Sequence, residues 1–199
     1  MSLSYDCASY LLKRPPREIE RHARRILRYL KPQPADRLLE VGCGRGFLTR
    51  RMRELCPSTT GVDLAPQSIA HAVTPGLLVM DATALQFGDA RFDKAYSFHA
   101  IEHIPRADLA LQEIRRVLVP GGRVLLVYPA EPIRGLYAIP GAWQGYGNPF
   151  KARELHVHRF TPGRMRVLAR QCGLTHVESA FNLFLVPQFL TVLERPAST

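Results

Sequence analysis

The segment Leu38 to Leu48, LLEVGCGRGFL, is the feature that most constrains how this chain can fold. A short apolar run leads into glycines at alternate positions, Gly42, Gly44 and Gly46, and a helix-like segment follows. Because glycine lacks a Cβ atom, the backbone can turn sharply there and a ligand can lie against it. The spacing differs from the G-x-G-x-x-G of dinucleotide-binding folds and from the G-x-x-x-x-G-K-[ST] phosphate loop. We therefore predict a buried strand, a tight turn and a helix start. Alone, this pattern is also typical of any tight strand-to-helix connection.

Strand-like and helix-like segments alternate along the rest of the chain. The expected strands are 59–63, 76–80, 92–98, 123–128, 175–181 and 183–193, and the expected helices are 17–30, 47–56, 66–71, 109–118 and 162–172. Such alternation is typical of a parallel sheet that is covered by helices on both faces. We find neither internal repeats nor an interdomain linker, so we expect residues 1–199 to form a single domain.

Composition excludes several classes of protein. No apolar run among the 199 residues is as long as a membrane span, and the N-terminus lacks the pattern of a signal peptide. The four cysteines, Cys7, Cys43, Cys56 and Cys172, are scattered without a C-x-x-C pair, which argues against zinc and against a disulfide scaffold. We therefore expect a cytoplasmic protein without a metal.

Positive charge is concentrated in the N-terminal part of the chain. Residues 13–53 hold thirteen of the twenty-seven Lys and Arg residues but only four acids. Within the N-terminal segment 1–34, apolar residues from Ile19 to Leu30 recur at helical spacing with arginines mostly opposite them, and Pro32 stops the pattern. This basic amphipathic helix could dock on an anionic membrane surface or on nucleic acid, or it could be a solvated helix that packs on the main domain.

Three polar positions follow the glycine turn at the ends of successive expected strands. Asp63 lies 21 residues after Gly42, Asp81 ends the third strand, and Ser97 to His99 end the fourth. Each acid alone is typical of a turn or a helix cap. Because ligands of open α/β sheets bind outside the carboxyl ends of the strands, these positions together predict one nucleoside site.

The chain resembles the class I S-adenosylmethionine-dependent methyltransferases, of the small type related to ubiquinone and menaquinone biosynthesis. The matching pieces are LLEVGCGRGFLT, TTGVDLAPQSI, MDATALQF, FDKAYSFHAIEHI, LVPGGRVLLVYP and HVHRFTPGRMRVLARQCGL, which run in the family's order over about residues 37–194. The resemblance implies an α/β fold, a Rossmann-like doubly wound sheet of seven strands, mostly parallel with an antiparallel last strand. It also implies S-adenosylmethionine as cofactor and in-line displacement of its methyl group.

The resemblance also implies roles for individual residues. The cofactor-binding residues would be Glu40, Gly42, Cys43, Gly44 and Gly46 near the methionine part, Asp63 at the ribose, Leu64, Asp81 and Ala82 at the adenine, and Ser97 and Phe98 near the sulfonium. Such a protein mainly positions and desolvates the reacting groups, so it requires a base only if the acceptor must lose a proton.

Histidines are the candidate bases, since this residue type titrates near neutral pH. His99 and His156 are the catalytic candidates, and His22, His71 and His176 are expected to be structural or solvated. Candidate substrate-binding residues are His103, Tyr128, Trp143, Tyr146 and His158. Several of these positions fall in the irregular, Pro- and Gly-rich insert 129–160, which we expect to lie over the acceptor site. For each, structural packing is the alternative role.

The acceptor is not specified by any motif. An oxygen, nitrogen or carbon atom of a small molecule, such as a quinone, a lipid or a secondary metabolite, is our main hypothesis. The basic N-terminal half leaves RNA methylation open, although no separate RNA-binding module is visible. A cofactor-binding partner protein without catalysis is a third alternative, and the intact glycines and acids argue against it.

Overall fold

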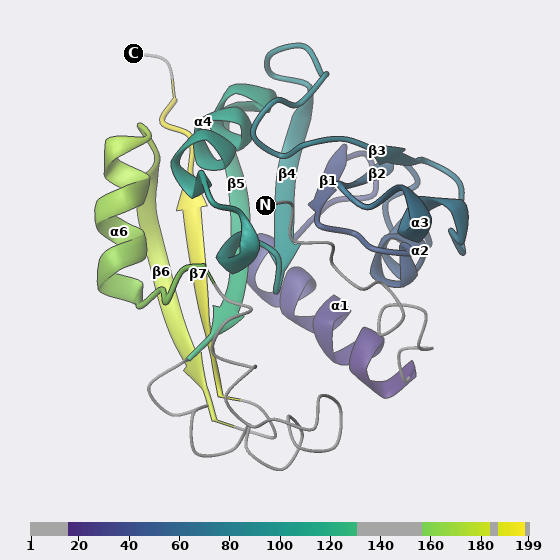
Figure 1. Cartoon of the computed structure of the whole chain (residues 1–199), viewed down its shortest axis with the longest axis horizontal. Coiled ribbons are helices and arrows are strands. Elements are labelled where there is room, and N and C mark those ends of the chain that lie inside the picture. The colour runs from purple at the N-terminus through teal and green to yellow at the C-terminus, as the bar shows by residue number, and fades with distance from the viewer. Residues whose placement is uncertain (1–15, 131–156, 184–186, 198–199) are drawn as a thin grey trace.

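The computed structural model describes residues 16–130, 157–183 and 187–197 of the chain. Its elements alternate along the sequence, as Figure 1 shows. They are α1 (Pro16–Leu30), β1 (Leu38–Val41), α2 (Phe47–Arg53), β2 (Thr59–Asp63), α3 (Pro66–Ala70), β3 (Leu77–Val79), β4 (Phe92–Phe98), the 3-10 helix η2 (Ile101–His103), α4 (Ala107–Val117), β5 (Leu118–Pro129), α6 (Pro162–Gln171), β6 (Thr175–Asn182) and β7 (Gln188–Glu194).

The strands form one seven-stranded sheet in the order β3-β2-β1-β4-β5-β7-β6. Pairing is parallel from β3 through β5, whereas β7 runs antiparallel to both β5 and β6. The predicted fold class, including the antiparallel last strand, is therefore confirmed. The strand order reverses between β1 and β4, and this switch point is where open α/β sheets bind ligands.

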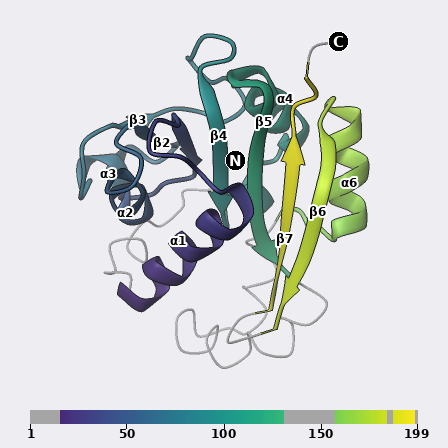
Figure 2. The same ribbon diagram turned by 180° about the vertical axis from the view of Figure 1, so that it is seen from behind.

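Helices cover both faces of the sheet, and each face has its own apolar core. On one face, α4 and α6 pack on the sheet through buried residues such as Leu111, Ile114 and Met165. On the other face, α1 and α2 bury Ala23, Ile26 and other apolar side chains. Figures 1 and 2 show these two faces, with α1 crossing the sheet in front of the strands in Figure 2.

Helix α1 matches the predicted amphipathic helix. Pro16 occupies its first position, a site that suits proline because the N–H there has no helical partner. Its apolar stripe packs on the main domain, as one of the sequence-based alternatives requires. Within the part of the chain that the structure describes, no helix has both the length and the apolar content needed to cross a bilayer.

Several element boundaries differ from the sequence-based expectation. Helix α2 ends at Arg53 and β3 is limited to Leu77–Val79. The segment Pro120 to Gly122 was expected to end a helix, yet it lies inside β5, which begins at Leu118. Leu118 pairs with Phe92 before a register shift, and the backbone of Gly121 and Gly122 exchanges hydrogen bonds with Arg195. These strand contacts extend β5 through an irregular segment.

Helix α6 begins as its sequence predicts. The Thr161 hydroxyl accepts a hydrogen bond from the backbone N–H of Arg164 at 3.3 Å, and Pro162 follows as the first helical residue. This cap fixes the direction in which the chain enters α6, directly after His158 and Phe160.

Candidate active site

The carboxyl ends of the parallel strands line one pocket. Its volume is about 760 Å³, and it is lined by the glycine turn, the loops after β2 and β3, the end of β4, the segment 103–106 and one side of α1. Of the predicted cofactor-binding residues, the pocket wall includes Glu40, Gly42, Cys43, Gly44, Asp63, Leu64, Asp81, Ala82 and Phe98. The expectation that the strand ends share one site therefore agrees with the geometry.

The three glycines of the turn all have positive φ, yet they meet different surroundings. A Cβ atom on Gly42 (φ +78°) would lie 2.2 Å from the Cβ of Ala100, so only glycine lets the turn approach the chain after β4. A Cβ atom on Gly44 (φ +54°) would meet nothing within 4 Å. Gly46 packs against Leu77 and does not line the pocket. The turn therefore presents the open backbone of Gly44 to a ligand.

Asp63 ties the glycine turn to the end of β2. Its Oδ2 accepts a hydrogen bond from the N–H of Gly44 at 2.7 Å, and its Oδ1 accepts one from the N–H of Ala65 at 2.9 Å. A carboxylate has about four acceptor sites, so both oxygens keep capacity for the hydroxyl groups of a bound ribose. The residue thus orients the turn and borders the pocket at once.

Asp81 has a turn role in addition to its place in the pocket. Its Oδ1 accepts hydrogen bonds from the backbone N–H and the hydroxyl of Thr83, at 2.8 and 2.7 Å. Leu64, which is 68% exposed, and Ala82 line the same end of the pocket. This part of the pocket wall therefore combines apolar side chains with a carboxylate.

Glu40 and Cys43 form the buried floor beside the turn. The Glu40 carboxylate accepts hydrogen bonds from the hydroxyl of Thr49 and, at 3.3 Å, from that of Tyr96. Burial, together with the negative charges of Glu40 and Asp63, raises the pKa of the Cys43 thiol far above its usual range. Cys43 is therefore a protonated, unreactive wall residue, since only a thiolate is an effective nucleophile.

His99 lies at the mouth of the pocket, directly after β4. Its backbone has φ +53°, an uncommon conformation for a residue with a Cβ atom. Its Nδ1 is 3.5 Å from Oε1 of Glu102, and the Glu102 side chain is only 2% exposed. Neither carboxylate oxygen of Glu102 has a hydrogen-bond partner among the described residues. The two side chains form a dyad in which a buried acid faces a histidine that is partly open to the pocket.

Two residues at this site were not foreseen from the sequence. Glu102 follows His99 by three residues, and the 3-10 turn η2 is what brings the side chains together. His22, expected to be structural or solvated, lines the pocket from α1, with its ring centroid 4.6 Å from that of Phe98 and 6.4 Å from that of His99. In the sequence, His22 shares one side of the helix with Ile19, Ala23 and Ile26. This position indicates that His22 faces the main domain.

Some predicted site residues lie away from the pocket wall. Ser97 is buried and does not line the pocket, because successive side chains of β4 point to opposite faces of the sheet. Tyr128 is fully buried between Phe160 and Phe189, and its hydroxyl contacts that of Thr191 at 2.8 Å, so it is a core residue. Its pKa is raised to about 12 by burial.

His103 lines the pocket, whereas His158 supports it from behind. His158 Nε2 lies 3.0 Å from the backbone oxygens of both Ile104 and Pro105, and the backbone N–H of His158 donates to the backbone oxygen of Glu102 at 3.1 Å. It therefore holds the loop that carries the acid of the dyad. His156, Trp143 and Tyr146 lie outside the described residues, as does most of the insert 129–160.

Comparisons with known proteins agree with this geometry. Residues 39–126 match the family model of a methyltransferase domain. The chain is 36% identical over 127 residues to a malonyl-[acyl-carrier protein] O-methyltransferase of Erwinia pyrifoliae, covering 62% of this chain and 48% of the relative. It is 32% identical over 158 residues to a ubiquinone biosynthesis O-methyltransferase of Cereibacter sphaeroides, covering 74% and 64%. The chain thus spans about half to two thirds of the length of these relatives.

A solved structure extends the likeness over nearly the whole chain. A SAM-dependent methyltransferase from Methanosarcina mazei superposes with a TM-score of 0.69 at 19% identity, covering 94% of this chain and all of that one. At this identity the likeness concerns the fold. Residues 39–126 match a methyltransferase domain, and the described fold is like that of a solved SAM-dependent methyltransferase.

Proposed function

We propose that this protein transfers a methyl group from S-adenosylmethionine to a small-molecule acceptor. The observation that carries the proposal is that Asp63, which holds the glycine turn, borders the same pocket as Asp81 and His99. When bound, the cofactor supplies an electrophilic methyl group on a sulfonium. The protein's contribution is then to bind, orient and desolvate the reacting groups.

The proposed cofactor contacts follow from the chemistry of the wall. Asp63 would accept hydrogen bonds from the two ribose hydroxyls, and the open backbone at Gly44 would take the methionine part. Leu64, Asp81 and Ala82 would contact the adenine, with the carboxylate accepting from its amino group. Ser97 and Gly46 do not line the pocket, so we assign them supporting roles in the strand and the turn.

We propose that His99 acts as the base for acceptors that must lose a proton. Because Nδ1 faces the Glu102 carboxylate, Nε2 is the nitrogen that can accept a proton from an acceptor hydroxyl. Glu102 would hold the ring in this orientation and stabilise the charged imidazolium that results. His103 and His22 would shape the apolar and polar walls around the acceptor.

A small molecule is the acceptor that the site favours. The pocket of about 760 Å³ has the size of a small-molecule site, and it would hold the cofactor and the acceptor together. The relatives named for malonyl-[acyl-carrier protein] and ubiquinone biosynthesis are both O-methyltransferases, which favours an oxygen acceptor such as a phenol or a carboxylate.

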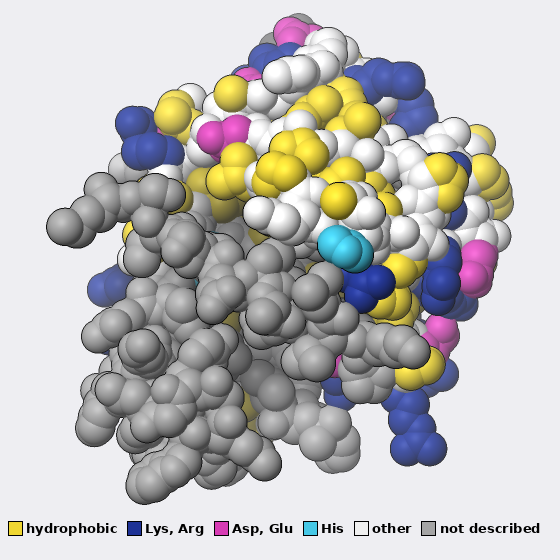
Figure 3. Space-filling view, turned by 45° about the vertical axis from the view of Figure 1, so that its right-hand side comes forward, with side chains coloured by type: hydrophobic (Ala, Val, Ile, Leu, Met, Phe, Trp, Pro, Cys, Tyr) yellow, Lys and Arg dark blue, Asp and Glu magenta, His cyan; other side chains and the backbone are white. Residues whose placement is uncertain are grey.

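RNA methylation is the second candidate, because the chain carries a formal net charge of +10. On the face drawn in Figure 3, however, the described Lys and Arg side chains lie apart, with hydrophobic and acidic side chains between them. A continuous basic band, the usual electrostatic footprint of RNA binding, is not present on that face among the described residues.

The test is a screen for release of S-adenosylhomocysteine from S-adenosylmethionine. Phenolic, carboxylate and amine acceptors form one set, and short single-stranded RNAs form a second. Turnover with a small molecule supports the proposal, and turnover with RNA alone contradicts it. The His99→Gln variant serves as the mechanistic control, since it should retain cofactor binding and lose turnover with phenols.

A further inference from the structure

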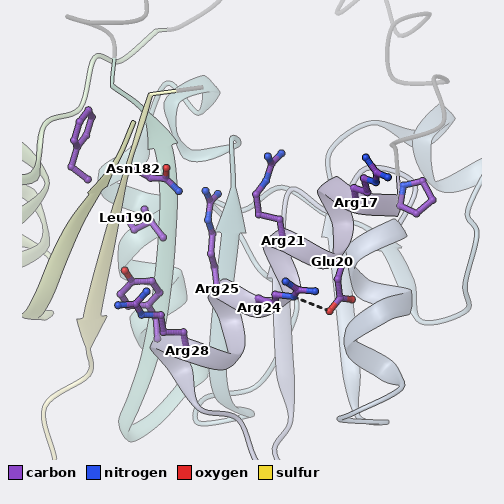
Figure 4. Close-up of a pocket in the computed structure, with 11 residues that line it drawn as sticks. Arg17, Glu20, Arg21, Arg24, Arg25, Arg28, Asn182 and Leu190 are labelled. Carbon is purple, nitrogen blue, oxygen red and sulfur yellow. Dashed lines mark hydrogen bonds and ion pairs between the residues drawn. The ribbon is translucent and has the colours of Figure 1, made fainter. Parts of the chain in front are cut away.

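A second pocket lies on the other side of α1, between this helix and the ends of β6 and β7. Its volume is about 760 Å³, and Figure 4 shows the residues that line it. Five arginines contribute to its wall: Arg17, Arg21, Arg24, Arg25 and Arg28. We call it the arginine groove.

Positive charge in the arginine groove exceeds what its acid can offset. Glu20 is the acid in the lining, and its carboxylate is 3.4 Å from Nε of Arg24 and 2.9 Å from Nε of Arg51. These two partners lower the pKa of Glu20, so the acid is ionised and already paired. The charges of Arg21, Arg25 and Arg28 are therefore not balanced by it.

Arg25 is the central residue of the groove. It is only 7% exposed, and its Nη1 donates a hydrogen bond to Oε1 of Gln188 at 2.8 Å. Its Nη2 and the Nε of Arg21 are buried without a hydrogen-bond partner among the described residues. In Figure 4 the side chains of Arg21 and Arg25 extend from α1 in the same direction.

Burying the Arg25 guanidinium beside the partly buried side chain of Arg21 is unfavourable unless a negative group joins them. Desolvation and, after it, the charge of Arg21 lower the pKa of Arg25. A bound anion would relieve the repulsion and would satisfy the unpaired donors at the same time. A phosphate group fits best, because several of its oxygens can accept hydrogen bonds from guanidinium groups simultaneously.

The groove also offers apolar surface beside the arginines. Leu190 is buried at its base, and Phe181, which is 46% exposed, stands at its edge. Arg28 lies over the ring of Tyr29, 5.5 Å from the centroid, which orders that guanidinium. The ligand class that matches this combination is an organic phosphate whose phosphate meets the arginines and whose apolar part meets Leu190 and Phe181.

We propose that the arginine groove is a binding site for an organic phosphate, separate from the methyltransferase pocket. Helix α1 forms a wall of both: Ile19 and His22 line the pocket on one side, and the arginines line the groove on the other. The site does not depend on methyl transfer, so it can be tested independently of the proposed function.

The experiment compares binding of a soluble and a membrane-borne phosphate. 1-Naphthyl phosphate, with 1-naphthol as the uncharged control, probes a free ligand by isothermal titration. Vesicles of phosphatidylcholine with phosphatidic acid, and of phosphatidylcholine alone, probe a lipid headgroup by cosedimentation. Binding to either phosphate probe, weakened about tenfold or more by Arg25→Gln, supports the proposal and identifies the source.

Matched variants separate a built site from general charge attraction. Arg91→Gln removes one exposed positive charge outside both pockets and should leave binding unchanged. If Arg25→Gln does not fold, as judged by circular dichroism, Arg21→Gln takes its place with the same expectation. Absence of binding by wild type, equal loss in Arg91→Gln, or binding of single-stranded RNA alone would each overturn the proposal. Titration of S-adenosylhomocysteine on the same proteins reports separately on the methyltransferase pocket.

Discussion

Nδ1 of His99 lies 3.5 Å from Oε1 of Glu102, a carboxylate that is almost fully buried and that has no hydrogen-bond partner among the described residues. A buried acid in this position is costly unless it interacts with a group that can carry positive charge. The arrangement suits a histidine that takes up a proton during the reaction, because the carboxylate stabilises the protonated ring.

Glu102→Gln should lower kcat by about ten- to a hundredfold with acceptors that must lose a proton, because the amide cannot stabilise the imidazolium as a carboxylate does. The affinity for S-adenosylhomocysteine should stay unchanged. The double variant with His99→Gln should be no slower than His99→Gln alone, since the two residues act as a unit. If the losses of steady-state rate in the two single variants added up in the double variant, Glu102 would act independently of His99.

Gly42→Ala and Gly44→Ala should separate folding from binding. The alanine at position 42 collides with Ala100, whereas at position 44 it meets only open space at a positive φ. We expect Gly42→Ala to lower the melting temperature markedly, and Gly44→Ala to cost about 1–2 kcal/mol of stability from backbone strain while weakening cofactor binding. Thermal denaturation and calorimetric titration measure the two effects. If Gly44→Ala were less stable than Gly42→Ala, this explanation of the turn would be contradicted.

His158→Ala should loosen the loop that carries Glu102. The single Nε2–H of the imidazole is shared between the backbone oxygens of Ile104 and Pro105, and such a hydrogen bond is worth about 0.5–1.5 kcal/mol. We expect a lower melting temperature and faster amide exchange at residues 101–105, while the exchange of β1 and β2 stays constant. If exchange in this loop were unchanged, His158 would not support the site from behind.

Asp93→Asn should destabilise the fold by about 1–2 kcal/mol, because Asp93 accepts two hydrogen bonds from the Arg37 guanidinium and one from its backbone N–H. The Arg37 contacts lower the pKa of Asp93 below its ordinary value of 3.8. Its contribution is therefore complete above that value and is lost as the pH falls through the lower, folded-state pKa. Urea denaturation at neutral and acidic pH measures this difference, which should shrink in acid.

A matched control for this pair is Asp89→Asn. Asp89 also contacts an arginine, Arg116, at 2.8 Å, but its side chain is 74% exposed. Exposed ion pairs contribute little because water screens them, so we expect a change below about 0.5 kcal/mol. An equal loss of unfolding free energy in Asp93→Asn and Asp89→Asn would mean that burial does not determine how much each ion pair contributes.

The fold and the cofactor side of the site could largely be predicted from the sequence. The glycine turn and Asp63 lie at strand ends. Because parallel strands bring their carboxyl ends to one edge of the sheet, the local sequence pattern and the topology predict the same ligand site. Asp81 follows from the same rule, whereas Leu64 was expected only from the family resemblance. The segment Pro120 to Gly122 does not end a helix as expected, because backbone hydrogen bonds exchanged with the distant Arg195 keep it in β5.

The acceptor side could not be predicted in the same way. His22 reaches the pocket only because α1 crosses the sheet, a packing that depends on contacts far away in the sequence. Tyr128 has the residue type of a substrate contact, but its strand position directs it into the core. The pairing of His99 with Glu102 depends on the 3-10 turn between them, which periodicity does not predict.

Calorimetric titration with S-adenosylhomocysteine, on wild type and Asp63→Ala, tests the central claim most directly. Asp63→Asn and Asp89→Asn, with melting temperatures for all variants, control for the loss of the contacts of Asp63 to Gly44 and Ala65. The account predicts that wild type binds and that Asp63→Ala binds more weakly by about 1.5–3 kcal/mol, or roughly ten- to a hundredfold. Absence of binding by wild type, or equal affinity in a folded Asp63→Ala variant, would contradict it.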